Sequence, residues 1–100
     1  MKKIDEMTCI EKLNSNGLSY ILNGILECVD KKSASEDEAK AIERIENDQR
    51  EIAGKSISSF ASAALSFLNI KQYEGSDEDV LELIAGWNSS PESFKERLAG

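Results

Sequence analysis

The sequence predicts an all-α fold, a compact single-domain bundle of about five helices that spans residues 1–100. Apolar residues recur with helical spacing along nearly the whole chain, and no segment shows the alternation of a half-buried strand. One hundred residues, of which 40% are apolar, are enough for one core. No repeat with a period of roughly 20–50 residues is visible, so a solenoid is not expected.

Two helices are expected before residue 31. The first covers about 4–14, where apolar residues recur at three-residue steps, and Asn16-Gly17 ends it because both residues tolerate a positive φ. The second covers 18–29, where the apolar positions follow the spacing i, i+3, i+4, i+7, i+8 and i+11. This spacing is typical of an amphipathic helix with one buried face.

A capping box predicts the start of the third helix. Ser35 and Glu38 fit the pattern S-x-x-E, in which each side chain bonds the other residue's free amide, so the helix should begin near Glu36. Only one edge is expected to be buried, because the other faces are charged. The narrow stripe consists of Ala39, Ile42, Ile45 and Ile52, and Gly54-Lys55-Ser56 interrupts or bends the helix.

Apolar side chains cover most of the circumference over residues 57–70. A helix of this kind lies at the centre of a bundle or against a partner chain, so a homodimer through Ile57–Ile70 is an alternative. Ser76 and Asp79 nearly form another capping box, and Ser90-Pro91-Glu92 is a strong start for a short terminal helix that Phe94 and Leu98 dock. The stripe of the helix after Ser76 is Val80, Leu83, Ile84 and Trp87.

The chain contains no histidine, the commonest acid–base group near neutral pH and the commonest transition-metal ligand. Cys9 and Cys28 belong to no Cys-x-x-Cys motif, and two thiols alone cannot complete a tetrahedral zinc site. We expect both thiols to be reduced and buried, with a disulfide as the alternative. No catalytic residues, no metal, no cofactor and no enzyme activity are therefore predicted.

Net charge and hydropathy restrict the partners and the location. The formal net charge of −7 opposes attraction to nucleic acid and to anionic lipid, so direct binding to nucleic acid is not expected. No apolar run approaches the ~18 residues that span a bilayer, and no apolar run follows the basic N-terminus. These features predict a cytoplasmic protein without membrane contact.

Residues 49–65 resemble a helix-turn-helix. Gln49-Arg50-Glu51-Ile52-Ala53 followed by Ile57-Ser58-Ser59-Phe60 is similar to the pattern of bacterial regulators. The spacing between the two parts is one residue short, and the second part carries no Arg, Lys, Asn or Gln to read base edges. A DNA-binding transcriptional regulator that uses residues 49–65 is our alternative function.

The acidic excess lies in two segments, residues 36–51 and 74–82. Carboxylates in the first turn of a helix stabilise it, so helix initiation explains many of them. The functional interpretation is that both segments converge on one surface that complements a Lys- and Arg-rich groove, with Tyr73 as an aromatic anchor and Trp87 more often a core residue. The candidate partner-binding residues are Glu36, Asp37, Glu38, Tyr73, Glu74, Asp77, Glu78, Asp79 and Glu82.

A small acidic helical chain without a catalytic set, with acidic runs at Glu36–Glu38 and Glu74–Glu82, is similar to phage-encoded inhibitors, in particular the anti-CRISPR proteins. The resemblance implies stoichiometric blocking of an RNA-guided bacterial surveillance complex, whose basic surface otherwise accepts target DNA. No family motif is present, so no residue role is carried over. We therefore expect a non-enzymatic interaction protein that binds and occludes a basic, nucleic-acid-binding surface of a partner.

Overall fold

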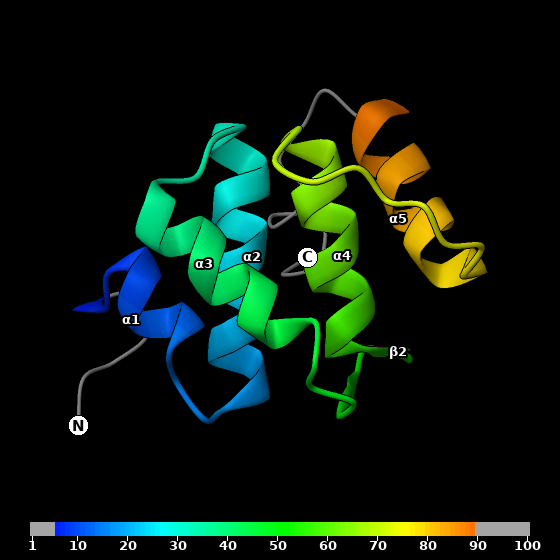
Figure 1. The fold of residues 1–100 in the computed structure, drawn as a ribbon. Helices are drawn as coiled ribbons and strands as arrows, with labels where there is room; N and C mark the ends of the chain where they lie inside the picture. The colour runs from blue at the N-terminus through cyan, green and yellow to red at the C-terminus, as the bar shows by residue number, and fades with distance from the viewer. Residues whose placement is uncertain (1–5, 90–100) are drawn as a thin grey trace.

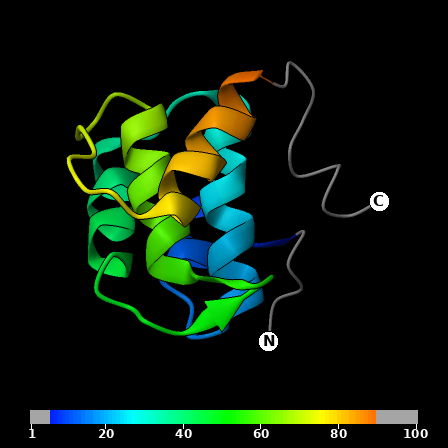
Figure 2. The same ribbon diagram turned by 90° about the vertical axis from the view of Figure 1, so that its right-hand side faces the viewer.

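The computed structural model describes residues 6–89, which form five helices and one very short two-stranded ribbon (Figure 1). This arrangement confirms the predicted all-α fold. Helix α4 lies in the middle of the molecule and packs against α2, α3 and α5, while α1 packs on α2 and α3 (Figures 1 and 2). The elements are α1 (Cys9–Leu13), α2 (Leu18–Lys31), α3 (Glu36–Ile45), β1 (Glu51–Ile52), β2 (Lys55–Ser56), α4 (Ile57–Phe67) and α5 (Glu78–Ser89).

Every residue of α4 is buried or half-buried. Its alanines Ala61, Ala63 and Ala64 are fully buried, so neighbouring helices pack closely around it. The prediction of a central helix is therefore confirmed. Helices of the same chain pack around α4, and the homodimer through Ile57–Ile70 stays an untested alternative.

Local capping fixes where two helices begin. Helix α3 starts at Glu36, as predicted, with the reciprocal Ser35–Glu38 capping box in place. Helix α1 starts at Cys9 because Thr8 and Glu11 form a capping box of the same kind, which the sequence analysis missed. The earlier part of the first predicted helix reaches into residues 1–5, outside the described range.

The predicted continuation of the third helix is wrong. Helix α3 ends at Ile45, and residues 51–56 form an antiparallel ribbon in which Glu51 pairs with Ser56 and Ile52 with Lys55. Just before β1, Asp48 accepts hydrogen bonds from the backbone amide and the guanidinium of Arg50, and these bonds hold the turn that leads into the ribbon. Residues 49–53 are therefore not the first helix of a helix-turn-helix.

The apolar stripe of α5 faces α4, and Trp87 is part of the core. Its side chain is 4% exposed and meets Phe67 of α4 edge to face, with the ring centroids 5.8 Å apart. This contact confirms the expectation that Trp87 is a core residue. The terminal helix predicted from Pro91, with Phe94 and Leu98, lies outside the described residues.

Candidate functional site

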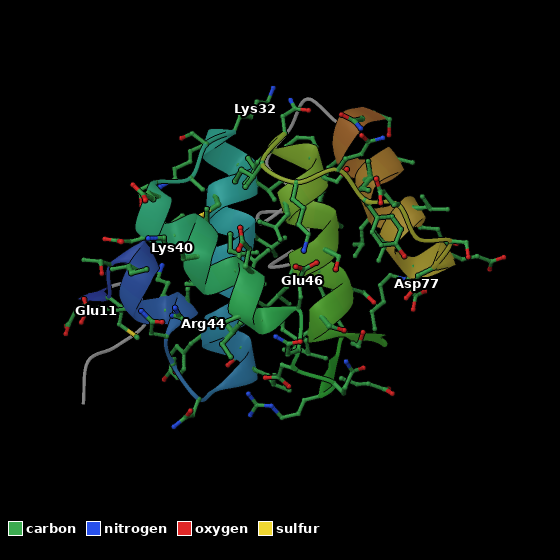
Figure 3. All side chains as sticks on the ribbon, viewed as in Figure 1. Glu11, Lys32, Lys40, Arg44, Glu46 and Asp77 are labelled. Atoms are coloured by element: carbon green, nitrogen blue, oxygen red, sulfur yellow. The ribbon has the colours of Figure 1, made fainter. Side chains whose placement is uncertain are left out.

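The acidic runs at the starts of α3 and α5 lie on opposite sides of the molecule, whereas Glu46, later in the first acidic segment, lines the same hollow as Tyr73 and Glu74. The start of α3, with Glu36–Glu38, is at the left of Figure 1, whereas the loop before α5 and the start of α5 are at the right. The labels of Lys40 and Asp77 in Figure 3 mark the same separation, with α4 between them. The candidate residues Glu36–Glu38 and Glu74–Glu82 therefore do not form one surface. Each acidic run occupies the first turn of its own helix, and the packing of α3 and α5 on different sides of α4 separates the two runs.

Glu38 is not available to a partner. It is 8% exposed, and its carboxylate accepts hydrogen bonds from the Ser35 amide at 2.8 Å and from the Lys31 ammonium at 3.1 Å. Burial alone would raise the pKa of Glu38, but these two hydrogen bonds, with smaller contributions from a Cys9 hydrogen bond and the Lys31 charge, hold the pKa below its ordinary value. Glu36 and Asp37 of the same run remain exposed. Glu38 is thus corrected from a binding residue to a buried ion-pair residue.

The other acidic segment keeps most of its carboxylates on the surface. Glu74, Asp77, Glu78 and Glu82 are exposed, and Asp79 is half-buried. Leu81 belongs to the same stretch and is 48% exposed. We call this surface the α5 acidic face; it consists of Glu74, Asp77, Glu78, Asp79, Leu81 and Glu82.

Lys55 of β2 connects the ribbon to this face. Its ammonium lies 3.3 Å from a carboxylate oxygen of Asp79 and 3.4 Å from one of Glu82. Hydrogen bonding to Asp79 and Glu82 raises the pKa of Lys55 above its ordinary value. Lys55 thus pairs with two of the five carboxylates, and the face keeps a net negative charge.

Tyr73, the predicted aromatic anchor, stabilises the loop before α5. The Tyr73 hydroxyl accepts a hydrogen bond from the Asp77 amide at 3.0 Å, and a carboxylate oxygen of Asp77 accepts one from the Asp79 amide at 2.9 Å. Tyr73 is half-buried against the core and orders the loop before α5. Leu81, which lies off the apolar stripe and is flanked by acids, is the exposed apolar residue that the sequence analysis missed.

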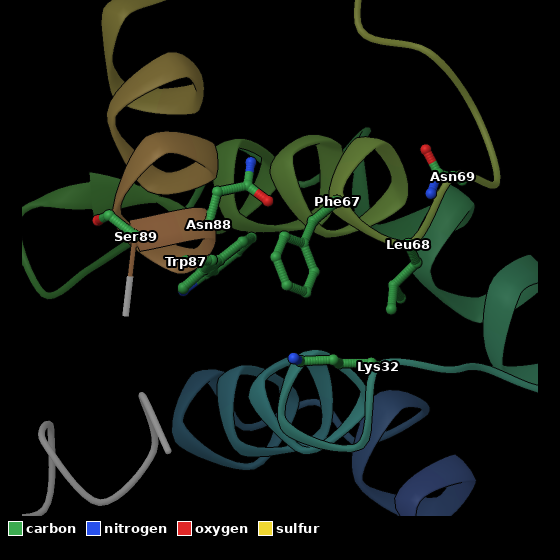
Figure 4. A pocket seen from close by; sticks show the side chains of 7 residues that line it. All are labelled: Lys32, Phe67, Leu68, Asn69, Trp87, Asn88 and Ser89. Atoms are coloured by element: carbon green, nitrogen blue, oxygen red, sulfur yellow. The ribbon is translucent and has the colours of Figure 1, made fainter. Parts of the chain in front are cut away.

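A hollow of about 460 Å³ opens at the C-terminal ends of α2, α4 and α5 (Figure 4). The aromatic rings of Phe67 and Trp87 lie next to each other at the hollow and face Lys32. Among the described residues that line it, Lys32 is the one charged group, so this part of the hollow offers no acid–base pair. The lining residues are Lys32, Phe67, Leu68, Asn69, Trp87, Asn88 and Ser89.

Two thiols and one carboxylate meet where α1, α2 and α3 pack together. The Sγ atoms of Cys9 and Cys28 are 3.4 Å apart, and both residues are free and buried, as predicted. Hydrogen bonding between the two thiols lowers the pKa of Cys28 and, together with burial, raises the pKa of Cys9. Glu38 completes the cluster. The sequence could have predicted the buried position of Glu38, because Glu38, Ile42 and Ile45 follow the i, i+4, i+7 spacing of one helix face.

No protein-family description, curated protein or solved structure matches this chain. Within residues 6–89, none of the helices combines the length and apolar character that crossing a membrane requires.

Proposed function

We propose that this chain is a non-enzymatic interaction protein that binds and occludes a basic, nucleic-acid-binding surface of a partner protein through the α5 acidic face. The observation that carries the proposal is the concentration of five carboxylates in and just before the first turns of α5, a stretch that also exposes Leu81, with Lys55 as the paired cation. Glu36 and Asp37 lie on the other side of the molecule and are not part of the proposed surface.

Charge supports the choice of a basic partner. Five carboxylates against one ammonium leave four negative charges without a counter-ion from Lys55. Such a potential accelerates encounter with a Lys- and Arg-rich surface and discriminates against acidic partners. Because these carboxylates are mostly exposed, salt should screen the attraction strongly.

Leu81 supports a protein partner. A single apolar side chain surrounded by charged ones resembles the centre and rim of a protein–protein contact, in which a buried anchor supplies affinity and polar neighbours exclude water. Glu78 and Glu82 flank Leu81 on the same exposed side of α5. The two features together favour a partner with an apolar recess inside a basic groove.

A groove built for the phosphate backbone has the required positive potential. An RNA-guided bacterial surveillance complex is the partner class that the resemblance to anti-CRISPR proteins implies, and its DNA-accepting channel is positively charged. Binding there would make this chain an inhibitor of the complex, acting in the cytoplasm.

Paired charge reversals on the two sides of the molecule test the proposal. Glu74→Lys/Glu78→Lys alters the α5 acidic face, and Glu36→Lys/Asp37→Lys makes the same change in net charge at the start of α3. Each variant, immobilised and checked for its melting temperature, is used to capture proteins from a nuclease-treated bacterial lysate. The amounts are then compared by quantitative mass spectrometry.

We expect a nucleic-acid-binding protein that the wild type and the α3 variant retain, that the α5 variant loses, and that added DNA duplex releases. Equal loss in both variants would contradict the proposal, because net charge alone would then explain capture. Retention by the α5 variant would contradict it as well.

A further inference from the structure

Three helices each contribute one metal-binding donor to the same buried point. Cys9 comes from α1, Cys28 from α2 and Glu38 from α3, and their donor atoms all lie within 4.8 Å of one another. The two sulfur atoms are 3.4 Å apart. Donors arranged tetrahedrally around one zinc ion lie about 3.5–3.8 Å from each other, as follows from Zn–S and Zn–O bond lengths. The two sulfur atoms are slightly closer than this and the widest donor separation is no more than 4.8 Å, so small side-chain shifts would bring the three donors onto one ion.

The burial of Glu38 beside two thiols indicates a role other than apolar packing. A carboxylate in the protein interior is costly unless other groups compensate its charge, and Glu38 keeps its charge through Lys31 and the Ser35 amide. With both thiols ionised, the two thiolates, the carboxylate and the Lys31 ammonium would sum to a charge of about −2. A divalent cation would cancel this charge.

We propose that Cys9, Cys28 and Glu38 form a binding site for one thiophilic divalent cation, of which Zn²⁺ is the representative. The site would have three protein ligands and a fourth position for water. Lys31 would act from outside the ligand set, holding the Glu38 carboxylate by hydrogen bonds. The sequence-based exclusion of zinc counted only the thiols, and the carboxylate of α3 supplies the missing third ligand.

Binding requires no oxidant or reductant. The S–H bonds of Cys9 and Cys28 break, two metal–sulfur bonds and one metal–oxygen bond form, and two protons pass to the buffer. No electron is transferred. The site is independent of the α5 acidic face, which lies on the other side of α4.

Cobalt titration of the full, reduced and metal-free chain tests the site. We expect one Co²⁺ per chain, a thiolate-to-cobalt charge-transfer absorption with the visible bands of tetrahedral cobalt, and displacement by one Zn²⁺. Cys28→Ser should abolish the charge-transfer absorption of the two-thiolate site. Glu38→Gln should weaken binding about 10-fold or more while keeping the capping box, which accepts glutamine. Glu36→Gln, an exposed position of the same helix, should bind like the wild type.

Three results would overturn the proposal. The first is the lack of a charge-transfer band in the folded wild type, and the second is an affinity for cobalt that Glu38→Gln leaves unchanged. The third is a reduced protein that takes up no metal but loses two thiols to oxidised glutathione, which would make the pair a dithiol that forms a disulfide. If Cys28→Ser fails to fold, the comparison of Glu38→Gln with Glu36→Gln decides.

Discussion

Ala53 and Gly54 are both left-handed at the tip of the β1–β2 ribbon, with φ of 57° and 82°. A two-residue hairpin loop with positive φ at both central positions matches the twist of the strands and favours Asn-Gly. Ala53 therefore adopts a conformation that its Cβ disfavours. This turn ends where Lys55 begins its contact with α5, so it influences both the ribbon and the α5 acidic face.

Replacing Ala53 should stabilise the protein. Asn tolerates the left-handed region better than Ala, so Ala53→Asn should raise the free energy of unfolding by about 0.5–1 kcal/mol. Urea denaturation with a constant m-value measures this change. A decrease in stability would show that the ribbon does not keep this turn in solution.

One substitution at two glycines separates backbone strain from helix propensity. Gly54→Ala should destabilise by about 1 kcal/mol through its positive φ, since no atom lies within 4 Å of the added Cβ. Gly86→Ala in α5 also meets no atom within 4 Å, and should stabilise by about 0.5–1 kcal/mol. Opposite signs in urea denaturation are the expected result; equal signs would contradict the assigned backbone conformations.

Two leucines distinguish the core from the proposed interface. Leu65 in α4 is 1% exposed, so Leu65→Ala should cost about 2–5 kcal/mol of unfolding free energy. Leu81→Ala, at an exposed position, should change stability by less than about 0.5 kcal/mol and still weaken partner capture. A large loss of stability in Leu81→Ala would place this side chain in the core and remove it from the α5 acidic face.

Acid should weaken the fold through Asp48. Hydrogen bonds from Arg50 hold the pKa of Asp48 below its ordinary value, so the folded chain binds this proton less readily than the unfolded chain does. The resulting stability is complete above the unfolded pKa of about 3.9 and is lost as the pH falls through the folded pKa. Asp48→Asn and Arg50→Ala should each flatten the acid slope of unfolding free energy. A double variant that flattens it further than either single one would show that the pair is not the cause.

Local signals in the sequence predicted where helices begin and which faces they bury. The Ser35–Glu38 capping box marked the start of α3, and the unbroken spacing over 18–29 predicted α2 with its buried side. The end of α3 was missed because Ile52 continues the apolar stripe in helical register. Its side chain is instead brought to the core from a strand, after the Asp48–Arg50 contact has turned the chain.

The candidate sites depended on packing that no local pattern encodes. Two acidic runs with the same role at their own helix starts ended on opposite sides because α3 and α5 flank α4. Cys9 meets Cys28 only through the docking of α1 on α2, which brings side chains of Lys12 and Leu13 against Gly24. Glu38 is an exception, because its helical spacing with Ile42 and Ile45 indicates burial. It was predicted to be exposed because acidic residues in the first turn of a helix usually face solvent.

Because neighbouring helices surround α4, its residues tolerate fewer substitutions than the exposed residues of α5 do. Ala61, Ala63 and Ala64 are fully buried, so a larger side chain at any of them would force α4 and a neighbouring helix apart. The outward positions of α5 face no such restriction, and their charges can be exchanged without disturbing the axis of the bundle. Enlarging the small residues of the middle helix should therefore cost far more stability than exchanging exposed charges on α5.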